Sequence, residues 1–467
     1  MYFKRDIYYE MLNWKENNSQ SKALQIEGSR QIGKTYIVRK FADEQFRRVY
    51  YFSLTEEPDL GRCKKAAEMS LSAENLMNFL VSDFEDAEDC VIVFDEIQNS
   101  SYIYRNIRPI VRGLKCKLIV TGSYLGRIFG DKEFWQPAGD LQYIKMFSLS
   151  FPEFLGINDK RNLYDSLDLL GNSNPEDYDD VRRYFRMYLI TGGYPGVVAR
   201  VLQAGTLENV NEEINEILRV FVSESINYMT SAVDISVYEN ILTGVARLLM
   251  QEKQGLPVIV EDLKDLVERE LVIDRKVITC CITWLINSGV LMYCDCFENC
   301  DFSNLRLNKR IYFTDVGMAR FFFNKAFRTS QVVGKVAENF AFINMLTFFK
   351  TMNLKHGKPA FATYFGGEID FILFVAGKRD VLSIAFEIKS GRSSGETASK
   401  LIADKKIDFL VYAKIETNGG MARNIITIPL FLLGKFNVFD YVPDLIKQEY
   451  DEAGALIKEM KAFKLDG

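Results

Sequence analysis

The segment GSRQIGKT, residues 28–35, has the residue types and spacing of a loop that holds phosphate groups. An apolar run precedes it and a stretch with helical spacing follows it, which is the setting that such a loop requires. Glycines let the backbone turn its N–H groups toward phosphates, and the helix end adds positive potential. We therefore predict a nucleotide site formed by Gly28, Ser29, Arg30, Gln31, Ile32, Gly33, Lys34 and Thr35.

Two residues of this loop have specific expected roles. Lys34 would reach the β- and γ-phosphates and take part in catalysis, and Thr35 would bind Mg²⁺. The structural alternative is an ordinary glycine turn between a strand and a helix, which the flanking segments disfavour.

The run VIVFDEIQN, residues 91–99, ends its apolar part in two carboxylates. Asp95 would hold the Mg²⁺ shell through water, and Glu96 could orient or deprotonate an attacking water. The next apolar run ends in TGS, so Thr121 and Ser123 would lie beside that water, where either could sense a γ-phosphate. The alternative is a buried strand that ends in two solvated acids. A chain that only held a nucleotide would not need Glu96, so the pattern favours hydrolysis.

A second group of charged residues lies near the C-terminus. Glu387 and Lys389 are two apart in an apolar run, so their side chains share one face of a strand. Asp370 on an earlier run could share a divalent metal with Glu387. Lys389 could orient a water or stabilise charge on phosphate, and Glu338 on the preceding helix could support the group. This order resembles the PD-(D/E)XK nuclease core; the alternative is a strand pair with solvated charges.

The composition limits the classes of protein. The chain has 467 residues, 48% of them hydrophobic, which predicts about three folded domains. A net charge of −5 confines any nucleic-acid surface to a local patch. We find no signal peptide and no apolar run long enough to cross a bilayer, and we expect reduced cysteines in a cytoplasmic protein. His356, in the loop-like LKHGKPA, is the single histidine: HExxH zinc sites are excluded, and we expect a surface residue rather than a member of a catalytic triad.

Apolar runs separated by helix-length gaps predict the fold of the N-terminal part: a parallel sheet covered on both faces. These runs are residues 23–28, 47–54, 90–97, 117–123 and 143–149. We predict an α/β protein with a P-loop ATPase domain at 1–156, a solvated linker at 157–180 and helical lid to 235, a winged helix at 236–328, and a nuclease-like α/β domain at 329–467 that ends in a helix at 443–463.

Two weaker patterns lie in the predicted winged helix. Residues 302–328 carry six bases and one acid with interleaved aromatics, which predicts contact with DNA through the wing. A wing that packs on its own domain with a solvated basic rim, or docks a protein, is equally compatible. The cysteines of the region have irregular spacing for zinc, so reduced thiols are the favoured interpretation: Cys280, Cys281, Cys294, Cys296 and Cys300.

Five motifs together resemble the bacterial and archaeal AAA+-type ATPases of the G-x-R-Q-x-G-K-T group: IEGSRQIGKT, VFDEIQN, LIVTGS, LSFPEFL and LITGGYPGVV. The resemblance covers nearly the whole chain. It implies an ASCE-class P-loop fold, ATP with Mg²⁺, a winged helix after the ATPase and a C-terminal restriction-endonuclease-like domain.

The chain departs from this family at one position. The family usually carries a Gly-Arg pair shortly before the LSFPEF segment, and this chain has Gly139 and Asp140 there. Arg127 and Arg30 are the candidate replacements.

Two functions remain open at this point. The first is an ATP-dependent enzyme that acts on nucleic acid. The second is a nucleotide-switched regulatory module that binds a protein or DNA partner without cutting it. The charged C-terminal group and the basic segment favour the first, whereas the acidic net charge and Asp140 favour the second.

Overall fold

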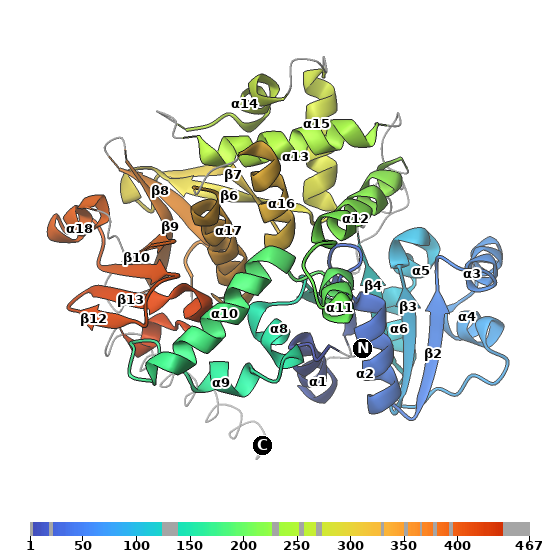
Figure 1. Cartoon of the computed structure of the whole chain (residues 1–467). Coiled ribbons are helices and arrows are strands. Elements are labelled where there is room, and N and C mark those ends of the chain that lie inside the picture. Colours follow the sequence, from blue (N-terminus) through green and yellow to red (C-terminus); the bar gives the residue numbers. More distant parts are fainter. Residues whose placement is uncertain are drawn as a thin grey trace. The chain divides into compact units, whose positions relative to one another are not determined.

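The computed structural model describes residues 3–17, 22–123, 139–226, 233–251, 256–267, 273–327, 331–349, 354–364, 367–376, 381–391 and 396–441. The chain divides into two compact units, coloured along the sequence in Figure 1. The first unit comprises residues 1–159, 191–241 and 269–292, and the second comprises 160–190, 242–268 and 293–467. The division into four domains stays a prediction, and the helix predicted at 443–463 lies outside the described residues.

The first unit is built on a parallel sheet. Within its described residues the strands are β1 (Ala23–Glu27), β2 (Arg48–Ser53), β3 (Cys90–Asp95), β4 (Lys117–Gly122) and β5 (Leu141–Lys145), in the order β2-β3-β4-β1-β5. Every neighbouring pair is parallel, as the apolar runs predicted. The phosphate-type loop follows β1, the two acids end β3, and TGS ends β4. The sheet therefore brings these motifs to one edge.

Helices cover both faces of this sheet. The described helices of the first unit, some of which cover the sheet, are α1 (Ile7–Asn17), α2 (Lys34–Gln45), α3 (Asp59–Glu68), α4 (Ala73–Leu80), α5 (Ser101–Arg105), α6 (Ile107–Gly113), α8 (Phe151–Ile157), α11 (Pro195–Ala204), α12 (Val210–Ser225) and α15 (Arg275–Asn287), with the short 3₁₀ helix η1 (Ile97–Asn99). Alternate residues of β2, β3 and β4, such as Phe52 and Phe94, form one apolar core with α3–α6. On the opposite face α2 buries Ile37, Val38 and Phe41.

Residues 157–180 are more ordered than the solvated linker that we expected. They contain helix α9 (Arg161–Ser166) and the start of α10 (Pro175–Thr191). Tyr164 and Tyr178 are buried, and the Tyr178 hydroxyl donates to the backbone of Asp168. The acidic residues that suggested a linker surround apolar anchors that a count of charges does not detect.

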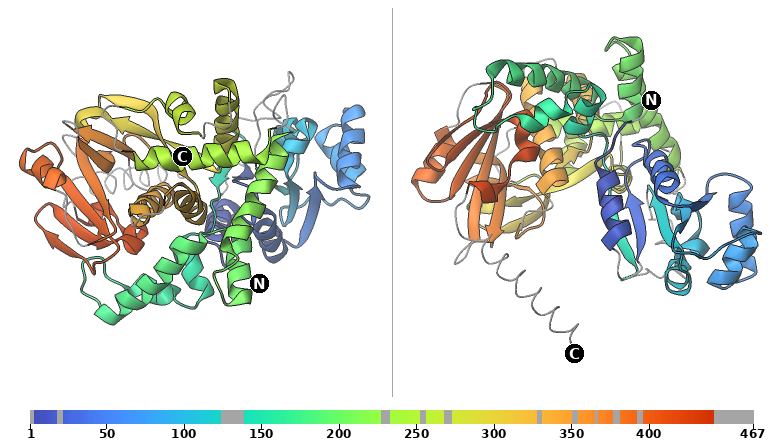
Figure 2. Two further views of the ribbon diagram at one scale, coloured as in Figure 1. Left: turned by 45° about the horizontal axis from the view of Figure 1, so that its top comes forward. Right: turned by 90° about the horizontal axis from the view of Figure 1, so that it is seen from below.

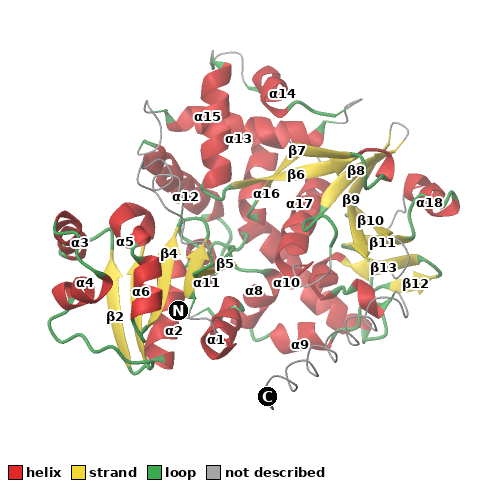
Figure 3. Ribbon diagram, turned by 180° about the vertical axis from the view of Figure 1, so that it is seen from behind, coloured by secondary structure: helices red, strands yellow, loops and turns green. Residues whose placement is uncertain are grey.

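The second unit contains a mixed sheet, drawn in yellow in Figure 3. Its described strands follow the order β12-β13-β11-β10-β9-β8-β6-β7. They are β6 (Leu291–Phe297), β7 (Leu305–Phe313), β8 (Ala360–Tyr364), β9 (Gly367–Ala376), β10 (Val381–Lys389), β11 (Phe409–Lys414), β12 (Gly420–Ala422) and β13 (Ile425–Pro429). Both strands predicted for the wing are present, but β6 also pairs in parallel with β8. The predicted boundary at residue 328 therefore divides one continuous sheet.

Helices of the second unit pack on this sheet, whose strands run from yellow to red in Figure 2. Helix α17 buries Phe342, whose ring stacks on Tyr312 of β7 with centroids 4.5 Å apart. Helix α18 connects the parallel strands β10 and β11 and buries Leu401. The remaining bounds are α13 (Ile235–Met250), which begins in the first unit, α14 (Ile259–Leu266), α16 (Val316–Ala326), α17 (Gln331–Phe348), α18 (Glu396–Ala403), η2 (Glu298–Cys300), η4 (Leu430–Lys435) and η5 (Val438–Asp440).

A search of the described helices for one long and apolar enough to cross a membrane finds none.

Candidate functional site

The loop after β1 depends on its two glycines for different reasons. Gly33 has φ +92°, a left-handed conformation that favours glycine, and it caps the start of α2. Gly28 has no such angle, but a Cβ there would overlap the carbonyl oxygen of Met146, which follows β5. The first glycine therefore permits close packing of two strand ends, and the second makes the turn into the helix.

Lys34 begins α2 and is almost completely buried. Its Nζ donates to the backbone oxygens of Gly28 and Ser29, both at 2.9 Å. Burial lowers the pKa of Lys34, the nearby carboxylate of Glu96 opposes this, and the charge of Arg30 lowers the pKa further. Both acceptors belong to the loop itself, so the ammonium can exchange them for phosphate oxygens without breaking a contact to another element.

Asp95 at the end of β3 accepts hydrogen bonds from hydroxyl groups of neighbouring elements. Thr35 Oγ1 donates to its Oδ2 at 2.7 Å, Tyr51 Oη donates to the same oxygen at 2.5 Å, and Thr121 Oγ1 donates to Oδ1. The structure thus brings together Thr35 and Asp95, the two residues predicted for Mg²⁺. Hydroxyl and carboxylate oxygens are the ligands that this hard cation prefers, so the donor set fits the ion.

Tyr51 is a member of this group that the sequence did not reveal. It lies on β2, next to β3 in the sheet. Burial and the hydrogen bond to Asp95 raise the pKa of Tyr51, so the phenol stays a donor. The guanidinium of Arg39 lies 4.0 Å from the centre of its ring.

Glu96 occupies an unusual backbone conformation. Its φ of +60° and ψ of 52° are left-handed, which costs about 1–3 kcal/mol for a residue other than glycine. Its backbone N–H donates to Thr121 Oγ1 at 3.1 Å, while its side-chain Oε2 accepts from Gln98 Nε2 and lies 3.5 Å from Ser123 Oγ. Of the two predicted sensor residues, Ser123 therefore lies beside the Glu96 carboxylate and Thr121 is bonded to Asp95.

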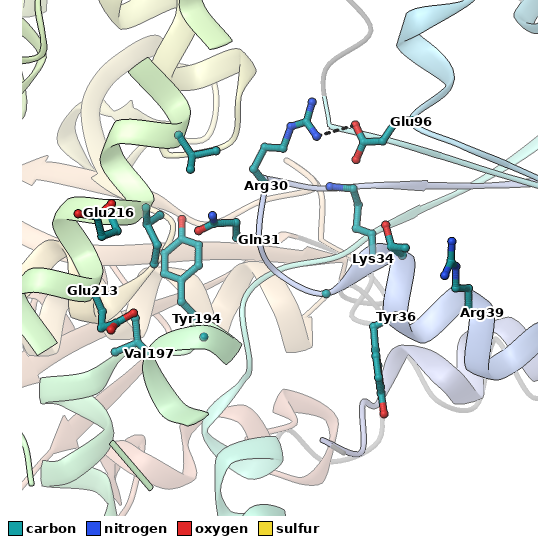
Figure 4. A pocket seen from close by; sticks show the side chains of 15 residues that line it. Arg30, Gln31, Lys34, Tyr36, Arg39, Glu96, Tyr194, Val197, Glu213 and Glu216 are labelled. Atoms are coloured by element: carbon teal, nitrogen blue, oxygen red, sulfur yellow. Dashed lines mark ion pairs between the residues drawn. The ribbon is translucent and has the colours of Figure 1, made fainter. Parts of the chain in front are cut away.

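A pocket of about 780 Å³ opens beside these groups, within the size range of nucleotide and cofactor sites. In Figure 4 the loop and α2 form one wall, and Tyr194, Val197, Glu213 and Glu216 point toward it from the segment of α11 and α12. Its lining includes Arg30, Gln31, Gly33, Lys34, Thr35, Tyr36, Arg39, Glu96, Tyr194, Gly196, Val197, Glu213, Glu216, Ile217 and Val220. A phosphate-rich ligand fits this combination of a glycine loop, a buried lysine and a helix start.

A buried arginine supports the loop from outside the motif. Arg5 donates to the carbonyl oxygens of Ile32 and Phe147, each at 2.8 Å, and to Glu153 Oε1 at 3.0 Å. Glu153 belongs to LSFPEFL and forms a capping box with Ser150 at the start of α8. The LSFPEFL motif therefore holds the guanidinium that supports the loop.

Asp140, which stands in place of the family arginine, has a structural role. It is buried, and its carboxylate pairs with Arg108 at 2.7 Å and Arg112 at 2.8 Å. Burial opposes ionisation, but these two arginines hold the pKa of Asp140 below its usual range. Arg127, one candidate replacement, lies outside the described residues. Arg30, the other, lines the pocket.

A comparison with known protein families finds matches for two segments of the chain. Residues 20–155 match the family described as "AAA domain". We refer to these residues below as the AAA domain, after the family that they match. Residues 182–327 match a second family, described as "Domain of unknown function (DUF8612)". No curated protein matches the chain.

Three solved structures illustrate the similarity found for this chain. The RuvB Holliday junction branch migration motor of Thermotoga maritima is 14% identical, with a TM-score of 0.27 over 62% of this chain and 90% of its own. AMPPCP-bound DnaA from Aquifex aeolicus is 13% identical, with a TM-score of 0.27 over 60% and 86%. Cdc6p from Pyrobaculum aerophilum is 12% identical, with a TM-score of 0.26 over 70% and 97%. The assignment of the AAA domain rests on the family match.

The second unit has a pocket of about 730 Å³ outside the AAA domain. Asp370, Lys389 and Glu338 line it together with Lys335 and Arg310. Glu387, the remaining predicted residue, is buried and is not among the described lining residues. Its carboxylate accepts from Lys389 Nζ at 2.6 Å. The structure therefore joins Lys389 to Glu387 and places Asp370 and Glu338 in the pocket.

The charges of this pocket are unevenly balanced. Burial raises the pKa of Asp370 to about 7, and the carboxylates of Glu338 and Glu387 add to this. Burial also raises the pKa of Glu387. The pKa of Glu338 is instead lowered, because Lys335 and Arg310 outweigh its burial, and Tyr312 Oη donates to it at 2.6 Å. Glu338 is therefore a stable anion, whereas Asp370 lies close to its titration point at neutral pH.

Metal binding in the second unit stays a prediction. Across the described ranges, no group of three or more His, Cys, Asp or Glu side chains is arranged to hold a metal ion. Cys280 is exposed, whereas Cys281, Cys294, Cys296 and Cys300 are buried and free. Burial raises the pKa of Cys294 and of Cys296 to about 12. Such thiols stay protonated at neutral pH, and the interpretation of reduced cysteines stays a prediction.

The basic segment 302–328 is less continuous than predicted, and Arg310 is the clearest correction. Its guanidinium lies 3.9 Å from the centre of the Phe361 ring and pairs with Glu368. Arg310 is thus largely buried at the second pocket rather than exposed for phosphate contact. Arg306 is exposed and pairs with Glu298 at 2.7 Å.

Proposed function

We propose that the AAA domain binds ATP with Mg²⁺ and hydrolyses it. The observation that carries this proposal is the 2.7 Å hydrogen bond between Thr35 and Asp95, which joins the phosphate-type loop to the carboxylate end of β3. Lys34 and Glu96 lie beside this pair and line one pocket. These four side chains supply separate functions for phosphate, metal and water.

Each side chain has a distinct proposed role. Lys34 binds the β- and γ-phosphate oxygens, and the loop N–H groups hold the remaining charge. Mg²⁺ bound near Thr35 and Asp95 would neutralise charge on the phosphates. Glu96 accepts a hydrogen bond from the attacking water and takes its proton, and Ser123 orients that water from the other side. The fixed backbone of Glu96 keeps this carboxylate in place.

An assay of phosphate release by the full chain tests the proposal. We expect turnover of ATP that requires Mg²⁺ and stops when the metal is removed by a chelator. Binding of ATP without any metal-dependent release of phosphate would reduce the function to nucleotide binding. Absence of ATP binding would reject the proposal.

We further propose that hydrolysis is coupled to an action on nucleic acid in the cytoplasm, with the exposed part of segment 302–328 as the contact. Arg306 and Lys325 are the exposed bases to substitute, because the Arg310 side chain is only 14% exposed. Alanine at both should lower DNA affinity and reduce the salt dependence by roughly 0.9 log unit for each lost phosphate contact. Two results together would favour the alternative of a nucleotide-switched module that binds a partner without cutting it. DNA would leave the ATPase rate unchanged, and the salt dependence of DNA affinity would be the same in the variant and the wild type.

Metal-dependent phosphodiester cleavage in the second unit is a second candidate activity. The observation in its favour is that Asp370, Lys389 and Glu338 line one open pocket that also contains Lys335. A cation between Asp370 and Glu387 would relieve the repulsion between their carboxylates. Cleavage of DNA with Mg²⁺ or Mn²⁺ should be lost in Asp370→Ala and in Lys389→Ala, and ATP turnover should persist. Equal cleavage by all three proteins would mean a contaminating nuclease.

A further inference from the structure

Arg30, the third residue of the loop, pairs with carboxylates of two different elements of the first unit. Its Nη1 lies 3.2 Å from Glu96 Oε2, as the dashed line in Figure 4 marks, and its Nη2 pairs with Glu224 Oε1. All three side chains are largely shielded from solvent, with exposures of 25%, 10% and 18% for Arg30, Glu96 and Glu224. Ion pairs at such burial resist screening by salt better than surface pairs.

Glu224 lies at a position where a carboxylate needs a cation. It is in the last turn of α12, where the helix dipole is negative and disfavours an acid, and that turn has no basic residue. The same helix lines the pocket through Ile217 and Val220. Arg30 therefore links the phosphate-type loop to the helix that forms the opposite wall of the pocket.

The surroundings of Arg30 also fit an anion. Arg30 and Lys34 lie close enough for the charge of Arg30 to lower the pKa of Lys34. A phosphate oxygen between two such cations would relieve their repulsion. The family that this chain resembles carries an arginine at the position of Asp140. Here the Asp140 carboxylate forms ion pairs with Arg108 and Arg112. The described pocket contains Arg30 and Arg39 as its guanidinium groups, and Arg39 stacks on Tyr51.

We infer that Arg30 contacts the γ-phosphate from within the same chain, and that Glu224 is the counter-ion that it exchanges for that phosphate. ATP then draws Arg30 away from Glu96, which leaves this carboxylate available to accept a proton from water. ADP lacks the third phosphate and leaves Arg30 paired with Glu96 and Glu224. The end of α12 is therefore tethered with ADP and released with ATP. This inference rests on the proposed function.

Calorimetry on the full chain tests this exchange through the ratio of affinities for the β,γ-imido analogue of ATP and for ADP, both with Mg²⁺. Arg30→Ala should lower the ratio at least about 10-fold and change ADP affinity less than about 3-fold, since a charge-assisted pair to phosphate is lost. Arg30→Lys keeps the charge without the fork and should fold when the alanine variant does not, with an intermediate ratio. Glu224→Gln removes the competing carboxylate and should raise the ratio by about 3–10-fold.

The decisive measurement is the double variant. If Glu224 acts through Arg30, Glu224→Gln should have no effect on the ratio in the Arg30→Ala background and a reduced effect in the Arg30→Lys background, where the cation is kept. Glu212→Gln is the matched control, because Glu212 is exposed on the same helix and is not among the described lining residues. A Glu224 effect that persists without Arg30, or a ratio that Arg30→Lys and Arg30→Ala leave unchanged, overturns the inference while ATP binding stands. A wild-type chain that binds neither nucleotide overturns the proposed function as well.

Discussion

Two pockets in the described part of this molecule treat their carboxylates in opposite ways. In the AAA domain Asp95 receives hydroxyl donors and Glu96 pairs with Arg30. In the second unit Asp370 lies near Glu338 and Glu387, and its pKa is raised to about 7. The first pocket already supplies partners for its acids, whereas the second leaves an acid that gains from a proton or a cation.

This difference indicates what each pocket is suited to bind. The first presents Lys34, Arg30 and a helix start, so it is suited to an anion, such as the ATP with Mg²⁺ that we propose. The second pocket presents Asp370, a carboxyl group that is difficult to ionise in its buried position. Residues with such perturbed pKa values cluster at functional sites. The predictions below test whether the pockets are independent and whether their charges act as described.

The largest effect should follow from Lys34→Ala, which removes the buried ammonium of the first pocket. Hydrogen bonds from a charged group are worth about 1.5–3 kcal/mol each, so ATP affinity should fall at least about 100-fold by calorimetry. Lys40→Ala is the control, since Lys40 lies on the same helix and pairs with Glu44 at 2.5 Å. Unchanged affinity in Lys34→Ala would remove the phosphate site.

Glu96→Gln should affect turnover and spare binding. The amide keeps the size of the side chain and loses the charge that activates water, so phosphate release should slow by about 100-fold or more. Calorimetry should detect ATP bound with affinity close to that of the wild type. Equal rates in the two proteins would show that another group accepts the proton.

Asp370→Asn should stabilise the second unit in a pH-dependent manner. The folded pKa of about 7 exceeds the unfolded value near 3.9, so the wild type loses stability as pH rises from about 4 to 7. Asparagine stays neutral and should raise the free energy of unfolding by about 1–3 kcal/mol at pH 8, with much less effect at pH 4.5. Thermal melting at both pH values measures this, and Asp440→Asn, at an exposed site, is the control. An equal shift at both pH values would contradict the assignment.

The smallest effect should come from Tyr51→Phe. It removes one hydroxyl donor from Asp95, a loss worth about 1 kcal/mol, so turnover at limiting Mg²⁺ should fall by roughly 5-fold. ATP binding without the metal should be unchanged. Tyr9→Phe, on the exposed side of α1, should match the wild type at every Mg²⁺ concentration. If Tyr51→Phe shows the same, the phenol has no part in the metal site.

Local patterns in the sequence predicted the parts of the first pocket that lie within single segments. The loop, the carboxylates that end β3 and the TGS that ends β4 each follow an apolar run, and parallel strands bring such ends together. The contacts of Tyr51, Arg5 and Glu224 escaped prediction because each joins positions far apart in the chain. No spacing rule relates Arg30 to Glu224 or Arg5 to Glu153.

The second unit shows the same limit on a larger scale. The strands of the wing and of the C-terminal region were recognisable by their apolar runs, but the pairing of β6 with β8 joins residues about 65 positions apart. Arg310 looked like a base for DNA because its neighbours in sequence are basic. Its burial depends on Phe361 and Glu368, which another part of the sheet supplies.

The support that Arg5 gives to the phosphate-type loop has a consequence for how this protein can be dissected. The AAA domain as a family match begins at residue 20, and Arg5 precedes it. A fragment trimmed to residues 20–155 would retain the loop, the carboxylates after β3 and the TGS segment, and would leave the Ile32 carbonyl and the buried Glu153 carboxylate without their guanidinium. Losing one member of a buried ion pair typically costs about 3–5 kcal/mol. Such a fragment would carry Lys34, Thr35, Asp95 and Glu96 while losing the guanidinium that supports their loop, and its inactivity would say nothing about the intact chain.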